Sequence, residues 1–198
     1  MNASNTPARG SSGKLEVGIV HDQDDVFAAM AIRAVVFVGE LDRRITDEFD
    51  GADFNSTLIL ARVDGEPAGT IRVRWYAGFA KLERVAVLRA YRSLRVFNAL
   101  ARFALNHAAE KGYAKYCGTA IPSTVKLWQR FGAQPMPDVP LATYEIPILN
   151  SIVLEGDIQP IRDSEEMMRD HELLRTPEHL WAEMRQVEAT QIVPLAAE

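Results

Sequence analysis

The sequence predicts an α/β (α+β) protein in which helices flank a mixed, mostly antiparallel sheet and a helical tail follows. Two observations favour this class. Short runs rich in β-branched and aromatic residues alternate with longer runs whose apolar residues repeat at helical spacing. The turn at Asp64-Gly65-Glu66-Pro67 joins two of the short runs in the way typical of a β-hairpin. With 198 residues, 47% of them hydrophobic, the chain can bury one sizeable core without a metal or a disulfide.

The first half of the chain predicts one strand, one helix and three antiparallel strands in succession. The helix has Asp22 or Asp24 as its expected N-cap, because a short polar side chain there can accept hydrogen bonds from free backbone amides. A second turn around 76–80 precedes the last of the three strands. The expected bounds are 15–20 for the first strand, 24–38 for the helix, 42–55 for an acidic loop, and 57–63, 68–75 and 81–88 for the antiparallel strands.

The second half predicts a long helix, a strand, a short helix and two further strands before the tail. Gly112 ends the long helix, since glycine readily adopts the left-handed conformation that follows many helices. The strand after this helix is expected to run parallel to the strand before it. Pro122 starts the short helix and Gly132 ends it. The expected bounds are 93–111, 114–120, 123–131, 142–149 and 151–154, with a charged helical tail over 163–189.

Three parts of the chain differ in composition. Residues 1–14 predict a disordered lead-in, residues 15–155 a single domain, and residues 156–198 an acidic helical extension. Residues 155–198 hold 11 acidic and 4 basic residues, whereas residues 1–154 hold 16 acidic and 18 basic ones, so the net charge of −5 comes from the tail. Apolar residues at helical spacing in the tail favour packing on the body over binding a separate partner.

The cysteine count and the length of the apolar runs indicate the cellular compartment in which the protein is expected. The one cysteine, Cys117, excludes an internal disulfide, and the N-terminus lacks the apolar run of a secretory signal. The longest apolar stretch, 26–38, contains Arg33 and is shorter than the ~20 residues of a membrane span. We therefore expect a cytoplasmic protein without a membrane span. The four histidines lack the spacing typical of metal ligands, so we expect no metal.

A basic stretch over 84–109 carries five arginines and no acidic residue. Such a field in an acidic protein suits a phosphate or an acidic partner better than nucleic acid, although a solvated helix face has the same pattern. The free amides at the start of the helix over 93–111 add partial positive charge at the same place. An anion is therefore expected at the segment Arg92-Ser93-Leu94-Arg95-Val96-Phe97.

Two motifs carry a family resemblance. The stretch LERVAVLRAYRSLRVFNALARFALNHAAEKGY resembles the central motif of the GCN5-related N-acyltransferase (GNAT) superfamily, and TVKLWQRFGA resembles its second signature. The resemblance implies a GNAT-like sheet whose two splayed central strands hold an acyl-CoA or acyl-pantetheine thioester as co-substrate, with the pantetheine paired to the backbone of Val85 and Val87. The residues implied to bind the donor are Val85, Val87, Arg92, Ser93, Leu94, Arg95, Val96, Phe97 and Trp128.

The chain departs from the GNAT pattern at two places. Arg95 and Phe97 stand where the family usually has glycines that let phosphate oxygens approach the backbone. Trp128 stands where the family usually has a tyrosine that protonates the leaving thiolate, so either Tyr116, Tyr144 or water is expected to serve instead, or the thiolate leaves unprotonated.

A narrower resemblance lies in the N-terminal half. Arg33-x-x-x-Phe37 followed by Glu48-x-Asp50-x-x-Asp53 resembles acyl-homoserine-lactone synthases and N-acyl amino acid synthases, although Lys81 stands where those synthases have a glutamate. IRAVVFVGEL is also similar to small acetyltransferases of unassigned substrate. Carboxylates pair strongly with guanidinium groups, so these residues can orient an amine or hold its pocket. The expected acceptor-binding residues are Arg33, Phe37, Asp53 and Arg72, and the expected catalytic residues are Glu48, Asp50 and Glu83, the last as a base.

The sequence therefore favours an N-acyltransferase that moves an acyl group from a pantetheine thioester to the amine of a small molecule or amino acid by direct attack. The alternative is a catalytically degenerate sensor of acyl-CoA or acyl carrier protein, or a scaffold. The basic stretch favours a carrier protein or a long-chain acyl-CoA over acetyl-CoA as donor. No nucleic-acid partner is expected, and a homodimer stays open.

Overall fold

The computed structural model describes residues 13–92, 94–136 and 151–181, and within these residues the strands form one mixed sheet. Its strand order is β1-β2-β3-β4-β5-β7-β6, and every neighbouring pair is antiparallel except β4 and β5. This confirms the predicted mixed, mostly antiparallel sheet. The strands are β1 (Leu15–Ile19), β2 (Thr57–Val63), β3 (Glu66–Tyr76), β4 (Phe79–Val87), β5 (Lys115–Ala120), β6 (Gln134–Pro135) and β7 (Ile152–Asp157).

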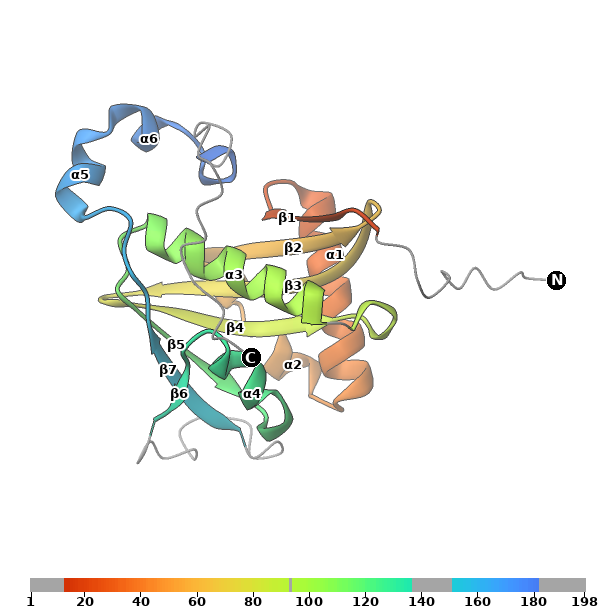
Figure 1. Ribbon diagram of the computed structural model, residues 1–198. Helices are drawn as coiled ribbons and strands as arrows, with labels where there is room; N and C mark the ends of the chain where they lie inside the picture. The colour runs from red at the N-terminus through yellow and green to blue at the C-terminus, as the bar shows by residue number, and fades with distance from the viewer. Residues whose placement is uncertain (1–12, 93, 137–150, 182–198) are drawn as a thin grey trace.

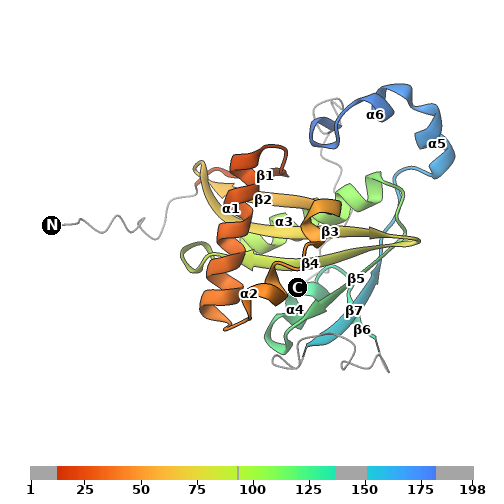
Figure 2. The same cartoon turned by 180° about the vertical axis from the view of Figure 1, so that it is seen from behind.

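Helices cover both faces of the sheet. Figure 1 shows α3 across one face with α4 beside β5, and Figure 2 shows α1 and α2 across the other. Each face has its own apolar core, the larger one under α3 and the smaller one under α1. The longer helical elements are α1 (Gln23–Arg33), a π-helix (Ala34–Glu40), α2 (Ile45–Glu48), α3 (Leu94–Glu110), α4 (Val125–Gln129), α5 (Ser164–Arg169) and α6 (His171–Arg175). Short 3-10 turns lie at η2 (Ala52–Asn55), η3 (Arg89–Tyr91), η4 (Pro122–Thr124) and η7 (Glu178–Leu180).

Strands β4 and β5 pair over only part of their length. Parallel pairing joins Ala80–Leu82 to Tyr116–Gly118 and then stops, so the strands separate beyond Leu82 and leave a fork. Gly118 is required at this closed end, because a Cβ atom there would lie 2.7 Å from the Leu82 carbonyl oxygen. The splayed central pair implied by the family resemblance is therefore confirmed.

A β-bulge lies in β4 at the open side of the fork. Arg72 of β3 pairs with Glu83 and Thr70 pairs with Ala86, so Arg84 and Val85 together oppose one residue of β3. Arg84 adopts a positive φ of 56°, which is uncommon for a residue with a side chain. The extra residue changes the alternation of side chains: Leu82 and Val85 pack in the core under α3, whereas Ala86 packs in the core under α1.

Several predicted elements differ from the structure. The acidic loop expected over 42–55 contains the short helix α2 and the 3-10 turn η2, and the described part of the helical tail expected over 163–189 is divided into α5, α6 and η7. The first helix was expected to run unbroken over 24–38, but it is α-helical only to Arg33 and continues as the π-helix to Glu40. The apolar spacing runs through this junction without a break, so the pattern could not reveal the wider turn. The last strand runs over Ile152–Asp157 rather than 151–154, and the strand expected over 142–149 lies outside the described residues.

The C-terminal segment packs on the end of α3. Trp181 is buried against His107, and the Glu178 carboxylate accepts a hydrogen bond from His107 Nε2 at 3.0 Å and pairs with Lys111. The ring of His179 stacks on that of His21, with the centroids 4.4 Å apart. The prediction that the apolar tail residues pack on the body holds for only part of the described segment: Leu173 and Trp181 are buried, whereas Met168 and Leu174 are exposed. Figure 1 shows α5 and α6 at the end of the molecule where α3 ends. In the described part of the chain, no helix is both long enough and apolar enough to cross a membrane.

The contact of Glu178 with His107 predicts a pH optimum for tail docking. The hydrogen bond from His107 lowers the pKa of Glu178 to about 2. Burial lowers the pKa of His107, but its bonds to Glu110 and Glu178 outweigh burial and raise that pKa overall. Docking should therefore weaken as the pH falls from about 4.3, the unfolded glutamate value, towards 2, and again as it rises past about 6.5 through the raised pKa of His107.

Hydrogen exchange of residues 171–181, corrected for intrinsic rates, measures this dependence. Glu178→Gln should flatten both limbs of the protection profile, whereas Glu165→Gln, at an exposed ion pair with Arg169, should leave the profile unchanged. Equal protection of the wild-type segment at every pH would contradict the assignment.

Candidate active site

A cluster of charged side chains lies between the sheet and the layer of α1, α2 and η2. Its residues come from four parts of the sequence, and most of them are withdrawn from solvent. The cluster holds six cations against four carboxylates, so it carries an excess of positive charge. The members of this charged cluster are Arg33, Arg43, Arg72, Arg74, Lys81, Arg84, Glu48, Asp50, Asp53 and Glu83.

The inner part of the charged cluster is the pair of Arg33 and Glu48. Arg33 Nε donates to Glu48 Oε1 at 2.6 Å and Arg33 Nη2 donates to the Glu48 carbonyl oxygen at 2.8 Å. Both side chains are 0% exposed. Burial raises the pKa of Glu48, against the opposing effect of the surrounding arginines. Two charges buried this deeply depend on each other, because removing either one leaves the other in a medium that solvates it poorly.

Arg72 joins the acidic loop to the sheet. Its guanidinium binds both oxygens of Asp50, at 2.7 and 2.8 Å, and its Nε donates to Glu83 Oε1 at 2.9 Å. Asp53 Oδ1 accepts from both Arg33 and Arg72, so it connects the two arginines. Six residues predicted from the sequence therefore meet in one place: Arg33, Glu48, Asp50, Asp53, Arg72 and Glu83.

Four cations of the charged cluster were not predicted as site residues: Arg43, Arg74, Lys81 and Arg84. Arg84 donates to Asp50 Oδ2 at 3.0 Å and to the Asp47 carbonyl at 3.1 Å, and it can do so because the bulge turns it towards α2. Arg43 pairs with Glu48, and its guanidinium lies over the ring of the predicted Phe37. Arg74 lies near Glu83. The register of β3 with β4 places Arg74 opposite Lys81. This neighbourhood follows only from the exact strand pairing, so the linear sequence pattern does not reveal it.

The predicted catalytic carboxylates differ in how they can act. Burial raises the pKa of Glu83, but Arg72 and Lys81 outweigh it and lower that pKa overall. The hydrogen bonds from Arg72 also lower the pKa of Asp50, which keeps this partly exposed carboxylate ionised. Glu48, whose pKa is raised, has no exposed surface. Asp50 and Glu83 are therefore weak bases in the neutral range, and Glu48 is out of reach of a substrate because it is fully buried. All three carboxylates can orient a cationic group or support the pocket.

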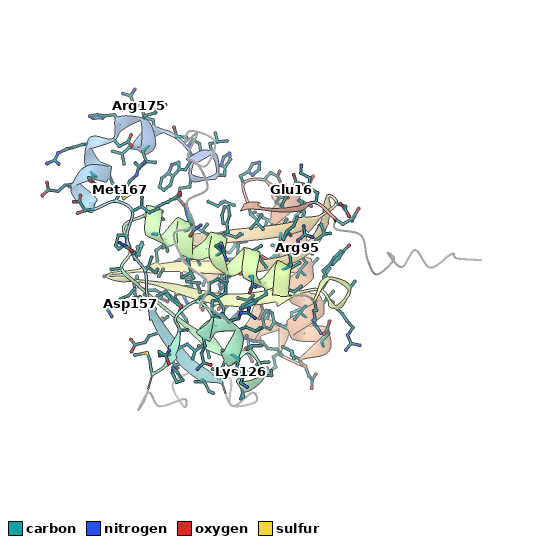
Figure 3. The ribbon with its side chains drawn as sticks, viewed as in Figure 1. Glu16, Arg95, Lys126, Asp157, Met167 and Arg175 are labelled. Carbon is teal, nitrogen blue, oxygen red and sulfur yellow. The ribbon has the colours of Figure 1, made fainter. Side chains whose placement is uncertain are left out.

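The open end of the fork lies at the start of α3. Arg92 Nε donates to the Val87 carbonyl at 3.1 Å and Arg92 also pairs with Glu40. Leu88 N donates to Ala68 O on β3, so the backbone of Val87 faces the opposite way, into the fork. Arg95 is exposed and donates to the Gly13 carbonyl at 2.6 Å; Figure 3 shows it at the beginning of α3. Of the predicted donor-binding residues, Val96 and Phe97 are buried, so only their backbone amides could meet a ligand. Ser93 and the side chain of Leu94 are not among the parts of the chain that the structure describes.

Aromatic side chains fill the space under the fork. The ring of Trp128 meets that of Phe97 edge to face, with centroids 5.2 Å apart, and Phe131 also meets Phe97 edge to face, with centroids 6.3 Å apart. The Tyr116 hydroxyl donates to the Phe131 carbonyl at 2.9 Å, and burial raises the pKa of Tyr116. Tyr116 is therefore poorly suited to protonate a thiolate, and Tyr144 lies outside the described residues.

The sequence profile of the acetyltransferase (GNAT) family matches residues 27–133. This range contains the charged cluster, the fork and the start of α3. The chain therefore belongs to the GNAT family. It is 38% identical over 81 residues to a Bacillus subtilis protein named as an acetyltransferase; the matched stretch covers 39% of this chain and 55% of that protein.

Solved structures of similar fold include three acyltransferases. An acyl-CoA N-acyltransferase from Pseudomonas aeruginosa superposes with a TM-score of 0.60 at 21% identity, covering 72% of this chain and 99% of that one. FeeM, an N-acyl amino acid synthase from uncultured soil microbes, gives 0.59 at 13% identity over 74% and 91% of the two chains. A Bacillus subtilis acetyltransferase in complex with CoA gives 0.57 at 16% identity over 73% and 99%. At these identities the likeness concerns the fold.

The pair of Arg33 and Glu48 predicts a large stability effect. Arg33→Met should lower the free energy of unfolding by about 3–5 kcal/mol, because it leaves Glu48 and Asp53 without their main counter-charge. The loss should shrink as the pH falls and Glu48 becomes protonated. Arg62→Met is the matched control: it removes a partly exposed pair with Asp25, worth about 0–1 kcal/mol. Urea unfolding measures both, and equal losses in the two variants would argue against a buried network.

Proposed function

We propose that this protein is an N-acyltransferase that moves an acyl group from a pantetheine thioester, on CoA or on acyl carrier protein, to the amine of a small molecule or amino acid by direct attack. One observation carries the proposal. The fork between β4 and β5 has the N-terminus of α3, preceded by Arg92, at its open end and a cluster of ionised side chains beside its closed end. A thioester lying along Val87 and Val85 would thus bring its carbonyl near Glu83, the first residue of β4 beyond the paired segment.

The open end of the fork suits the phosphates of the donor. The N-terminus of α3, a helix of 17 residues, offers free amides and partial positive charge. Arg92 and Arg95 add two formal charges, which take over the attraction that glycine-rich loops supply through the backbone alone. The B. subtilis relative solved with CoA supports a CoA thioester. Arg89 is exposed on η3 and is available to an acidic carrier protein, so both donors stay within the proposal.

The charged cluster suits an acceptor that is itself a zwitterion. At its outer edge, Asp50 is 30% exposed and stays ionised, which fits an ammonium group. Arg74, Lys81 and Arg84 are also partly exposed there, and they fit a carboxylate. Together with the excess of cations, this favours an amino acid over a simple amine. The inner residues Arg33, Glu48, Asp53 and Arg72 would hold the pocket in shape.

The transfer itself needs only these elements. The acceptor nitrogen attacks the thioester carbonyl, the C–N bond forms, and the C–S bond breaks as the thiolate leaves with its electron pair. The amine gives up its proton to water, with Glu83 as the nearest carboxylate of the fork. Because the pKa of Glu83 is lowered, it would serve to orient that water more than to hold the proton.

A sensor that binds the thioester without turnover is the second candidate. The observation that favours it is Trp128, which is buried at the family's tyrosine position and whose indole N–H is too weak an acid to protonate a thiolate. Calorimetry with CoA together with an assay of thiol release separates the two. The transferase binds and releases thiol when amino acids are added, the sensor binds only, and a scaffold does neither.

The acceptor side yields a mutational prediction. Asp50→Asn should raise the KM for the acceptor about tenfold or more, because it removes a charge-assisted contact worth about 1.5–3 kcal/mol. The affinity for CoA and the melting temperature should change little. An equal loss of CoA affinity, or a melting temperature low enough to explain the defect, would mean that Asp50 only supports the fold.

The lowered pKa of Glu83 and of Asp50 yields a pH prediction. Both carboxylates are ionised throughout the neutral range, so neither should produce a step there. The value of kcat/KM for an amino-acid acceptor should rise with pH through the whole neutral range, up to the pKa of the acceptor amine, which in a free amino acid lies well above that range. A plateau set by a protein group between about pH 5 and 7 would contradict this assignment.

The donor side yields a third prediction. The double change Arg92→Ala and Arg95→Ala should raise the dissociation constant for CoA by about tenfold or more without unfolding the protein, because both side chains are largely exposed. Arg102→Ala, further along the same helix, is the control for CoA binding. If Arg102→Ala instead weakens transfer from acyl carrier protein in a salt-dependent way, the carrier protein is the donor. Unchanged affinity for CoA in the double variant would remove the phosphate site from α3.

A further inference from the structure

The turn end of the β3–β4 hairpin carries two stacked aromatic rings. Tyr76 and Phe79 lie directly opposite each other in the register of the hairpin, and their rings are parallel within 4°, with centroids 5.0 Å apart. Both side chains are partly exposed, and neither belongs to the apolar core under α3 or to the one under α1. Figure 2 shows this end of the hairpin extending beyond α1 and α2. The aromatic pair is therefore a partly open surface that the packing of these two cores does not account for.

This aromatic pair lies on the same face of the sheet as the charged cluster. Residues two apart on a strand point to the same face, so Tyr76 follows Arg74 on β3, and Phe79 precedes Lys81 on β4. The guanidinium of Arg74 lies over the ring of Tyr76, 5.1 Å from its centroid. Arg74 and Lys81 also pair with Glu83, at 3.8 and 2.9 Å. The aromatic pair thus continues the outer edge of the charged cluster, one row of residues further along the hairpin.

The row between Glu83 and the aromatic pair holds two cations side by side. Arg74 and Lys81 lie opposite each other in the register, and like charges at such positions repel. Glu83 also accepts a hydrogen bond from Arg72, so its charge is shared among three cations. Both Arg74 and Lys81 keep some exposed surface. This row therefore suits a carboxylate that arrives from solvent.

The spacing of the rows matches the size of one kind of amino acid. Successive rows on one face of a strand lie about 6.5 Å apart. That is close to the separation of the carboxylate and the ring in an aromatic amino acid. An acceptor with its carboxylate at Arg74 and Lys81 and its amine towards Asp50 and Glu83 therefore places its side chain on the aromatic pair. A flat ring gains stacking energy there beyond the burial of apolar surface, which an aliphatic side chain does not.

We infer that the acceptor of this transferase is an amino acid with an aromatic side chain, and that Tyr76 and Phe79 are the residues that select it. The inference rests on the proposed function, because it assumes acyl transfer to an amino acid at the charged cluster. The charged cluster determines how the ammonium and carboxylate groups are held, whereas the aromatic pair determines which side chain accompanies them. An acceptor with a second carboxylate would place that charge against two rings, which solvate it poorly.

The test measures kcat/KM for L-phenylalanine, L-alanine and L-glutamate by thiol release, with the more active of acetyl-CoA and octanoyl-CoA as donor. The wild-type protein should use phenylalanine at least about tenfold better than alanine or glutamate. Tyr76→Ala and Phe79→Ala should each reduce the preference for phenylalanine over alanine severalfold, whereas Tyr76→Phe, which keeps the ring, should retain it. Phe79→Leu, which keeps an apolar side chain without a ring, gives the same readout if the alanine variant does not fold.

The preference is a ratio measured on one preparation, so a loss of folded protein cancels from it. A pair that only stabilises the hairpin would therefore leave the ratio unchanged. Phe27→Ala is the matched control, because Phe27 is an aromatic residue of α1 that is 60% exposed, and it should keep the wild-type preference.

Two outcomes would overturn the inference while the proposed function stands. In one, the wild-type protein uses alanine or glutamate about as well as phenylalanine. In the other, the variants at Tyr76 and Phe79 that remove a ring keep the wild-type preference. If no amino acid causes thiol release, the proposed function fails, and the inference fails with it.

Discussion

The bulge at Arg84 determines how the two sides of this site are built. A regular β4 would send Glu83 and Arg84 to opposite faces of the sheet. The extra residue instead brings Arg84 towards α2, where it meets Glu48, Asp50 and the Asp47 carbonyl. It also returns Val85 and Val87 to the core under α3. The positive φ of Arg84 costs about 1–3 kcal/mol by itself, and the three contacts of its guanidinium offset that cost. One local irregularity thus separates a charged face from an apolar one along the same strand.

The charged cluster is better understood as a device for position than as a source of stability. Burying Arg33, Arg72, Glu48 and Glu83 costs desolvation that their mutual attraction roughly repays, and apolar residues of the same volume could fill that space. What the ion pairs provide is a fixed geometry. Asp53 is shared by Arg33 of α1 and Arg72 of β3, so the acidic loop cannot shift without breaking contacts to both. A rigid loop presents Asp50 at one place beside the fork, which is what an acceptor site requires.

Much of this arrangement could be predicted from the sequence, and the part that could not has a physical reason. Hairpin turns, helix caps and apolar spacing predict nearly every strand and helix because they depend on neighbours within a few residues. The acidic spacing from Glu48 to Asp53 and the arginines Arg33 and Arg72 were identified through a family pattern, and the structure brings them together. Arg43, Arg74 and the role of Arg84 depend on strand register and on a bulge, which arise from tertiary packing. The π-turn after Arg33 and the fit of Trp128 under the fork depend on it as well.

The two departures from the family pattern are one feature in three dimensions. Phe97 replaces a small residue at the start of α3, and Trp128 replaces a tyrosine on α4, and in the sequence these look like separate losses that weaken an enzyme. In the fold their rings contact each other. The bulk added at Phe97 supports the ring of Trp128, and Trp128 in turn lines a small cavity at the closed end of the fork, together with Leu82 and Gly118. Under the proposed function, a single packing unit beside the fork fits a change of specificity as readily as a loss of function, because the helix N-terminus, the fork and the charged cluster are all present. The lost tyrosine then costs less than it suggests, since a thiolate is a good leaving group at neutral pH when its thiol has a pKa near 8.5.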